Sequence, residues 1–242
     1  MAEPTAEAVS RHPHLAAAQA EGRVRVDLHT HTMWSGDSTT TPEEFAGAVS
    51  SGGLDVVCIT DHNAIAGAVE LRDRVDARVI VGEELRTAAG EIIGLFLAER
   101  IPMGVGHVDA ARAIRDQGGV VYVPHPFDPM RRNLNEAALY ELAELDLIDA
   151  VEVLNAKTSL GSLNRRAADF AAEFGIVGGA GSDAHVPEAL GAAYVEIDDF
   201  DGPMEFLAAL ANAEVVGHHW DEPRPWSPRI VPSVTAGGRR QR

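Results

Sequence analysis

The chain has 242 residues, of which 45% are hydrophobic and 24% are charged, and this balance excludes a disordered or fibrous protein. Its net charge of −17 disfavours binding of long nucleic acids, although a small anion can bind where cations are concentrated locally. Cys58 is the single cysteine, which excludes a disulfide framework and a cysteine-ligated zinc cluster. Without an apolar run of ~18 residues or a signal peptide, the sequence predicts a cytoplasmic protein with no membrane contact.

The two ends of the chain differ in composition from the segment between them. Residues 1–22 are rich in alanine and glutamate and predict a short helix or a loose arm. Prolines and terminal glycines and arginines predict an extended, partly disordered tail over residues 218–242. We therefore expect one folded domain over residues 23–217.

Between the ends, short runs rich in valine and isoleucine alternate with segments of helical period. The clearest helix start lies at Thr41, with Pro42 in the first position and Glu44 in the third. Residues 109–117 and 134–145 also have helical spacing. This alternation predicts an α/β domain with a largely parallel sheet, either a barrel or a doubly wound sheet. The expected strands are Val24–Leu28, Leu54–Thr60, Arg78–Gly82, Ile92–Leu97, Gly119–Val123, Ile148–Leu154, Ile176–Gly179 and Tyr194–Ile197.

Side chains of metal-ligand type follow the ends of these runs. His29 and His31 follow the first run, and residues two apart on an extended chain point to the same side, so both can reach one ion. Because sites in parallel α/β architectures form at the carboxyl ends of the strands, the pattern predicts a polynuclear metal centre. Histidine and carboxylate without cysteine suit two or three divalent ions such as Zn²⁺, Mn²⁺ or Fe²⁺. The later runs contribute, in the same way, His62, Glu84, His125, Asp183 and His185.

Six short motifs together resemble the PHP (polymerase and histidinol phosphatase) family over about residues 24 to 197. In chain order they are DLHTHT, SGDS, TDHN, GEEL, VPHP and GSDAH. The resemblance implies a distorted (β/α)7 TIM-like barrel with a di- or trinuclear metal centre at the C-terminal mouth of the strands. It also implies a hydrolase acting on phosphoric ester bonds, since most stand-alone members are phosphoesterases.

The resemblance distributes the ligands among three ions. The first ion would be held by His29, His31, Glu84 and Asp183. Glu84 would bridge to a second ion that also uses His125. The third would be held by Asp37, His62 and His185, and an aspartate at position 37 resembles the branch that includes nucleotide phosphoesterases.

Glu91 departs from the family pattern, in which many members have a histidine ligand just before an Ile-x-Gly-Leu strand. As an oxygen ligand, Glu91 would give the second ion a harder, more negative shell that favours Mn²⁺ or Fe²⁺ over Zn²⁺. The other interpretation is a solvated turn residue, which would weaken the second ion.

Residues next to these motifs are candidates for substrate binding and for support of the ligands. Arg131 and Arg132 follow His125 and are placed to grip a phosphate, and Asn155 is placed to face the pocket. Asp27 and Asp61 would either accept the second N–H of a ligand histidine or bond to backbone. We expect Glu83 to have a structural role, and we expect three histidines to lie at the surface: His12, His14 and His107.

These features predict a metal-dependent phosphoesterase that hydrolyses a small phosphate ester, such as a nucleotide or sugar phosphate, by metal-activated hydroxide. Arg131 or Arg132 would neutralise the phosphate oxygens, and His185 or Asp37 would assist the leaving alkoxide. The alternatives are a nuclease on short oligonucleotides and a non-catalytic metal- or phosphate-binding regulatory module. A C–N hydrolase would need a bridging lysine carbamate, for which Lys157 is the sole candidate.

Overall fold

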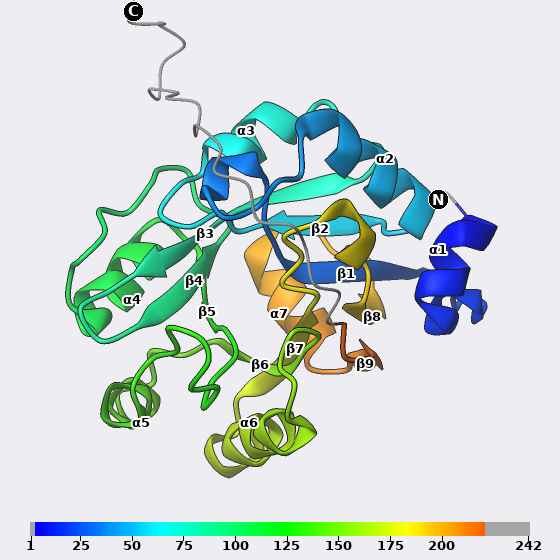
Figure 1. Ribbon diagram of the computed structural model, residues 1–242. Helices are drawn as coiled ribbons and strands as arrows, with labels where there is room; N and C mark the ends of the chain where they lie inside the picture. Colours follow the sequence, from blue (N-terminus) through cyan, green and yellow to red (C-terminus); the bar gives the residue numbers. More distant parts are fainter. Residues whose placement is uncertain (1–2, 221–242) are drawn as a thin grey trace, which may run out of the picture.

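The computed structural model describes residues 3–220 and arranges the strands as a curved sheet with helices on its outer side (Figure 1). The strands are β1 (Arg23–Thr30), β2 (Val56–Ile59), β3 (Arg78–Arg86), β4 (Glu91–Leu95), β5 (Val120–Val123), β6 (Ala150–Asn155), β7 (Val177–Gly181), β8 (Ala193–Asp198) and β9 (Glu214–Gly217). The α-helices are α1 (Ala6–Arg11), α2 (Pro42–Gly52), α3 (Ala66–Leu71), α4 (His107–Asp116), α5 (Glu136–Glu144), α6 (Gly161–Phe174) and α7 (Gly202–Leu210).

The sheet has the strand order β7-β6-β5-β4-β3-β2-β1-β8-β9 and is nearly closed into a barrel. Closure occurs between β1 and the segment after β7, where the Asp183 N–H donates to the His29 carbonyl at 2.8 Å. The His31 N–H donates in turn to the Ala184 carbonyl at 3.0 Å. The predicted distorted TIM-like barrel is thus confirmed, and closure brings the first and last ligand motifs side by side.

The prediction of a largely parallel sheet is wrong for part of the barrel. Strand β4 runs antiparallel to both β3 and β5, and β8 runs antiparallel to both β1 and β9. A tight turn explains β4, since the Thr87 N–H donates to the Gly90 carbonyl at 2.9 Å and leaves no room for a crossover helix. Because β4 returns in this way, its first residue, Glu91, lies at the same edge of the sheet as the end of β3.

Helix α2 begins where the sequence predicts. The Glu44 N–H donates to the Thr41 hydroxyl at 3.3 Å, and the Glu44 carboxylate accepts from the Thr41 N–H at 2.8 Å, which completes a capping box. Gly53 ends the helix with φ of 62°, a left-handed conformation that costs glycine little. The apolar face buries Phe45 and Val49 in a cluster that includes Val57 and Ile59 of β2.

The barrel interior is filled by side chains from successive strands, including Val26, Leu28, Ile93, Tyr122 and Val195, all fully buried or nearly so. Two further apolar clusters lie between the sheet and the surrounding helices. Side chains therefore pack the barrel beneath the metal-ligand motifs, as is general for this architecture.

The N-terminal segment is a short helix packed on the barrel, so the loose-arm interpretation is wrong. Leu15 is buried, and the buried Arg25 side chain donates to the Ala17 carbonyl at 2.6 Å. His12, expected at the surface, is buried beneath the segment that carries His218. Of the predicted tail, the described part ends at Trp220, and residues 221–242 lie outside the described residues.

Strand β9 was not predicted, because a four-residue edge strand with half-exposed side chains has little periodicity to detect. It pairs with β8 from Ala193↔Gly217 to Glu196↔Glu214. Within residues 3–220, no helix combines the length and the apolar character needed to cross a membrane.

Candidate metal centre

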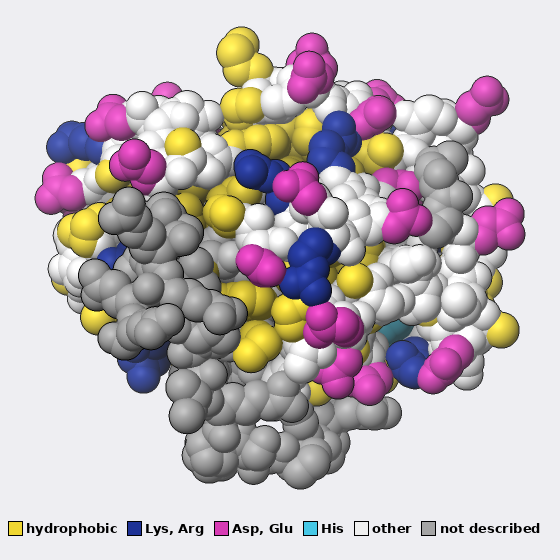
Figure 2. Space-filling view, turned by 90° about the horizontal axis from the view of Figure 1, so that it is seen from above, with side chains coloured by type: hydrophobic (Ala, Val, Ile, Leu, Met, Phe, Trp, Pro, Cys, Tyr) yellow, Lys and Arg dark blue, Asp and Glu magenta, His cyan; other side chains and the backbone are white. Residues whose placement is uncertain are grey.

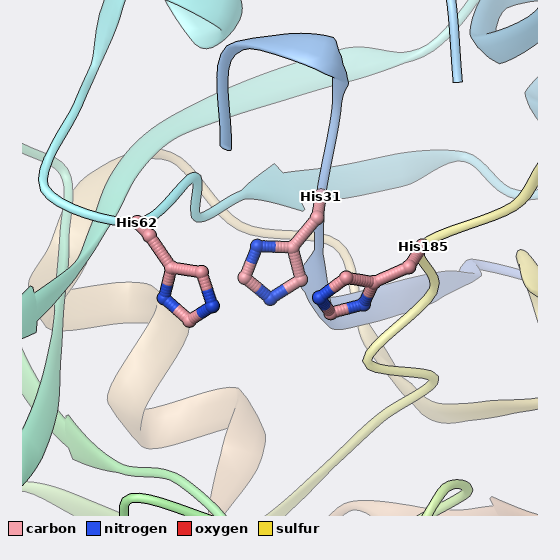
Figure 3. Close-up of side chains that lie close together, drawn as sticks. All are labelled: His31, His62 and His185. Atoms are coloured by element: carbon pink, nitrogen blue, oxygen red, sulfur yellow. The ribbon is translucent and has the colours of Figure 1, made fainter. Parts of the chain in front are cut away.

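The nine predicted ligands lie together at one mouth of the barrel. Four overlapping groups have ligand atoms within 4.8 Å of one another. They are His29–His31–Glu84, His29–His125–Asp183, His62–Glu84–Glu91 and His31–His62–His185. Figure 3 shows the three rings of the last group converging from three separate segments of the chain. Asp37 joins the same group from the turn that follows β1.

His29 and His31 form the deepest part of the centre, with their Nε2 atoms only 3.0 Å apart. Glu84 Oε2 lies 3.4 Å and 3.3 Å from these two atoms. Asp183 Oδ1 lies 3.8 Å and 3.4 Å from them. All four side chains are buried, so unpaired lone pairs would face one another at high cost unless a cation lies among them.

Hydrogen bonds behind the rings fix which nitrogen faces the centre. His29 Nδ1 lies 3.1 Å from Glu152 Oε1, and because a carboxylate accepts, this nitrogen carries a proton and leaves Nε2 to face the centre. His31 Nδ1 lies 3.0 Å from the Ser35 hydroxyl. Both rings therefore present Nε2, the donor set expected for a divalent ion.

The carboxylates make this region strongly attractive to positive charge. Burial by itself would lower the pKa of His29, but Glu152, Glu84 and Asp183 outweigh it and raise that pKa well above its usual range. Burial would likewise raise the pKa of Glu84, yet His29 and His62 hold it well below the usual range. A site with this polarity fits a metal cation.

Glu84 is placed to bridge two ions because its two oxygens face different partners. Oε1 lies 3.0 Å from His125 Nε2, while Oε2 lies 3.0 Å from His62 Nδ1 and near both rings on β1. Glu91 Oε1 is a buried oxygen without a hydrogen-bond partner, and it lies 3.7 Å from His62 Nδ1. An unpaired carboxylate oxygen beside a shared carboxylate fits a second cation.

Glu91 is buried and faces the centre, which excludes the interpretation as a solvated turn residue. It reaches this position because β4 runs antiparallel and starts at the mouth. Burial and the neighbouring Glu84 raise the pKa of Glu91 to about 7. A buried carboxyl group of this kind is stabilised in its ionised form by a cation.

Asp37 lies at the outer edge of the centre, half exposed to solvent. Its Oδ2 is 3.2 Å from both His62 Nε2 and His185 Nε2. Partial burial would raise the pKa of Asp37, but hydrogen bonds from His185 and His62 hold it far below the usual range. His62 therefore lies between two groups, with Nδ1 toward Glu84 and Nε2 toward Asp37.

The backbone is strained at the centre. His125, Asp183 and Asn63 have φ of 30°, 51° and 53°, a left-handed region uncommon for residues other than glycine. Two of the three are predicted ligands, and Asn63 directly follows a third. Such strain persists only where surrounding contacts enforce it, and it is concentrated at functional sites.

Asp27 and Asp61 do not support the ligand histidine rings. Asp27 accepts backbone N–H groups, including Ser182 at 2.9 Å, and Asp61 accepts the N–H and hydroxyl of Thr32, both at 2.6 Å. The backbone-bonded interpretation is therefore the right one. Glu152 takes the supporting role, and its only sequence signal was an isolated acid within a run of apolar residues.

The two arginines after His125 separate in the structure. Arg131 approaches the centre, with Nη2 3.7 Å from Asp183 Oδ2 and with its buried Nε unpartnered. Arg132 is exposed, and its carbonyl accepts from the Glu91 N–H at 2.9 Å. The side chain of Asn155 is fully buried, and both its amide nitrogen and its amide oxygen form hydrogen bonds within the protein. This arrangement suits positioning rather than substrate binding.

Lys157 lies at the mouth, although its position after a predicted strand and its being the only lysine assigned it no role in the sequence. Its Nζ is 3.0 Å from His185 Nδ1 and 3.7 Å from Asp183 Oδ1. Burial lowers the pKa of Lys157, with Asp183 acting in the opposite direction. Lys157 and Arg131 are thus two cationic side chains beside Asp183 at the rim of the centre.

The sequence matches two family models, "PHP domain" over residues 27–143 and "PHP-associated" over residues 161–215. It is 38% identical to the uncharacterized protein MJ1587 of Methanocaldococcus jannaschii over 58% of this chain and 87% of the relative. It is 32% identical to MJ0417 of the same organism over 77% of this chain and 79% of the relative.

The fold is similar to that of a two-domain protein of Bacteroides vulgatus that contains a predicted PHP-like metal-dependent phosphoesterase. The TM-score is 0.67 at 18% identity, covering 84% of this chain and 67% of that one. The fold, the convergent ligand set and the sequence matches agree. The chain therefore belongs to the PHP family, a family of metal-dependent hydrolases that act on phosphoester bonds.

Proposed function

We propose that this protein hydrolyses the phosphate ester of a small molecule, such as a nucleotide or sugar phosphate, at a centre of two or three divalent ions. The observation that carries this proposal is the position of Arg131, whose guanidinium lies beside Asp183 at the rim of the ligand cluster. A cation next to a metal centre suits a phosphate better than a neutral ester or an amide.

The ligand residues would hold the ions in the groups described above. His29, His31, Glu84 and Asp183 would hold the first, while Glu84, His125 and Glu91 would hold the second. The third would be held by Asp37, His62 and His185. Bound divalent ions supply Lewis-acid polarisation of the phosphoryl group and lower the pKa of water. The carboxylate of Glu91 favours Mn²⁺ or Fe²⁺ over Zn²⁺ at the second position.

The side chains around the ions bind the substrate and manage its charge. Arg131 would donate to the non-bridging phosphate oxygens from the loop after β5. Asp37 remains ionised, since its pKa is held low, and therefore acts as a ligand and acceptor rather than as a proton donor. His185 is also a proposed ligand, and its Nδ1 lies 2.9 Å from the Asp183 carbonyl oxygen, so it too acts as a ligand here rather than as the proton donor for the leaving group.

A small substrate is favoured over a long nucleic acid by the charge of the protein. The net charge is −17, and acidic side chains are spread among a few basic ones over the face shown in Figure 2. The described residues of that face form no continuous basic stripe, which a polyanion would need.

The test is release of inorganic phosphate from a panel of sugar phosphates, nucleoside mono- and bisphosphates and short oligonucleotides, with Mn²⁺, Fe²⁺ or Zn²⁺ supplied. Asp183→Ala provides the background. We expect release from a small ester that disappears in the variant, whose fold is checked by circular dichroism. Exclusive cleavage of oligonucleotides, or activity in the variant equal to that of the wild type, would contradict the proposal.

A further inference from the structure

Arg131 and Lys157 flank Asp183 from two different loops. Arg131 Nη2 lies 3.7 Å from Oδ2, and Lys157 Nζ lies 3.7 Å from Oδ1 of the same carboxylate. Neither distance is that of a hydrogen bond, so Asp183 attracts both cations without using their N–H donors. Arg131 Nε also has no partner. Both side chains are about one-quarter exposed.

The contact between Lys157 and His185 is incompatible with metal ligation by that ring. His185 Nδ1 lies 3.0 Å from Lys157 Nζ and 2.9 Å from the Asp183 carbonyl oxygen. An ammonium only donates and a carbonyl only accepts, so the nitrogen can satisfy one of them at a time. When His185 offers the Nε2 lone pair to an ion, Nδ1 carries the proton and bonds to the carbonyl. The donors of Lys157 are then left for another acceptor.

Hydrogen bonds hold the two cation-bearing loops in a fixed relation. The Thr158 hydroxyl donates to Asp128 Oδ2 at 2.9 Å, and both side chains are buried. Asp128 begins the turn that leads to Arg131, whose N–H donates to the Asp128 carbonyl at 3.1 Å. Asn155 Oδ1 accepts from the Lys157 N–H at 2.9 Å and so fixes the other loop. The spacing of the two cations is therefore built into the fold.

We propose that Lys157 and Arg131 form a two-cation clamp that binds the terminal phosphate of a monoester substrate, with Asp128 and Thr158 as positioning residues. This inference rests on the proposed phosphoesterase function and specifies its substrate class. Lys157 contacts the substrate, whereas the Asp128–Thr158 bond acts through the loops.

Charge complementarity selects a monoester over a diester. A terminal phosphate has three non-bridging oxygens and carries ≈ −1.5 to −2 charge at neutral pH, which matches two cations. A diester has a single negative charge and two non-bridging oxygens, so the second cation gains little from it. Lysine as a point charge and arginine as a planar fork also suit two different oxygens of one phosphate.

The first experiment measures binding of inorganic phosphate to the metal-loaded protein by calorimetry. Lys157→Gln should lose about 10- to 100-fold in phosphate affinity, the size expected for one hydrogen bond to a charged group. Thr158→Val keeps its shape and should weaken binding in the same direction. Arg112→Gln removes an exposed positive charge from α4 and is the matched control, expected to bind phosphate like the wild type. Metal content is measured for every variant and should not change.

The second experiment compares an aryl phosphate monoester with the diester of the same aryl alcohol. The wild type should prefer the monoester, and Lys157→Gln should raise its KM more than it lowers kcat. If the wild type hydrolyses the monoester and Lys157→Gln has unchanged phosphate affinity and KM, the clamp is wrong while the phosphoesterase stands. Preference for the diester also overturns the clamp. If the protein hydrolyses neither ester and no compound of the earlier panel, the proposed function itself is wrong.

Discussion

Glu152 holds His29 in place from behind the metal centre, with Oε1 3.1 Å from His29 Nδ1. Its Oε2 accepts from the His125 backbone N–H at 2.6 Å and from the Asn155 amide at 2.9 Å. One buried carboxylate thus fixes the ring of one predicted ligand and the backbone of another. A histidine ligand needs such a partner to keep its tautomer and orientation.

Replacement of Glu152 by glutamine should lower metal affinity. Only one end of the glutamine amide can accept a hydrogen bond. Its NH2 group would therefore face either the His29 N–H or the N–H donors now bonded to Oε2, and two donors cannot bond to each other. We expect a loss of about 10- to 100-fold in affinity for the first ion. Competition with a chromogenic chelator measures it. Glu141→Gln, which removes the exposed partner of His107, is the matched control, and equal affinity in both variants would contradict the role of Glu152.

Glu91 should set the metal preference. Glu91→His replaces a hard oxygen by an imidazole nitrogen and should shift the Mn²⁺-to-Zn²⁺ affinity ratio toward Zn²⁺. Glu91→Gln should weaken the ion shared with His62 and Glu84, because a neutral amide is a poorer ligand for a cation. Metal competition followed by elemental analysis measures both effects. An unchanged ratio in Glu91→His would show that this side chain does not ligate.

Gly181 allows β7 to approach β1 behind the centre. A Cβ there would overlap His29 Cβ and lie 2.7 Å from Glu152 Oε1. Gly181→Ala should therefore destabilise the fold by about 1–3 kcal/mol and also lower metal affinity. Urea unfolding measures the first effect and chelator competition the second. Gly47→Ala is the contrasting variant, since a Cβ at that site on α2 meets nothing within 4 Å and should stabilise by about 0.4–1 kcal/mol.

His12 should make the protein acid-sensitive, independently of the metal ligands. Its Nε2 donates to the Glu188 carbonyl at 2.9 Å, and burial lowers the pKa of His12 from 6.5 to about 4. Between these two values the unfolded chain binds a proton that the folded protein excludes. Stability is therefore lost as pH falls through this window.

This proton changes the free energy of unfolding by about 1.4 kcal/mol per pH unit at most. His12→Gln retains an amide donor and does not titrate. The free energy of unfolding of this variant should therefore fall less steeply with falling pH than that of the wild type. Urea unfolding at pH 7, 5.5 and 4.5 compares the two proteins. Parallel curves would show that His12 is protonated equally in both states.

Much of the candidate site could be predicted from local sequence. The spacing of His29 and His31 at the end of β1 places this pair on one side of the chain whatever surrounds it. The capping box at Thr41 is likewise a local arrangement. These features depend on backbone geometry over a few residues, which the sequence specifies directly.

Other features depended on how distant segments meet. Only the antiparallel return of β4 brings Glu91 to the mouth, and only barrel closure brings Glu152 behind His29. The pairing of Lys157 with Arg131 across Asp183 likewise joins two loops that the sequence separates. Residue types and strand-end positions were determined by the sequence alone. Which of them touch was decided by tertiary packing, because strand direction and barrel closure arise from contacts between distant residues.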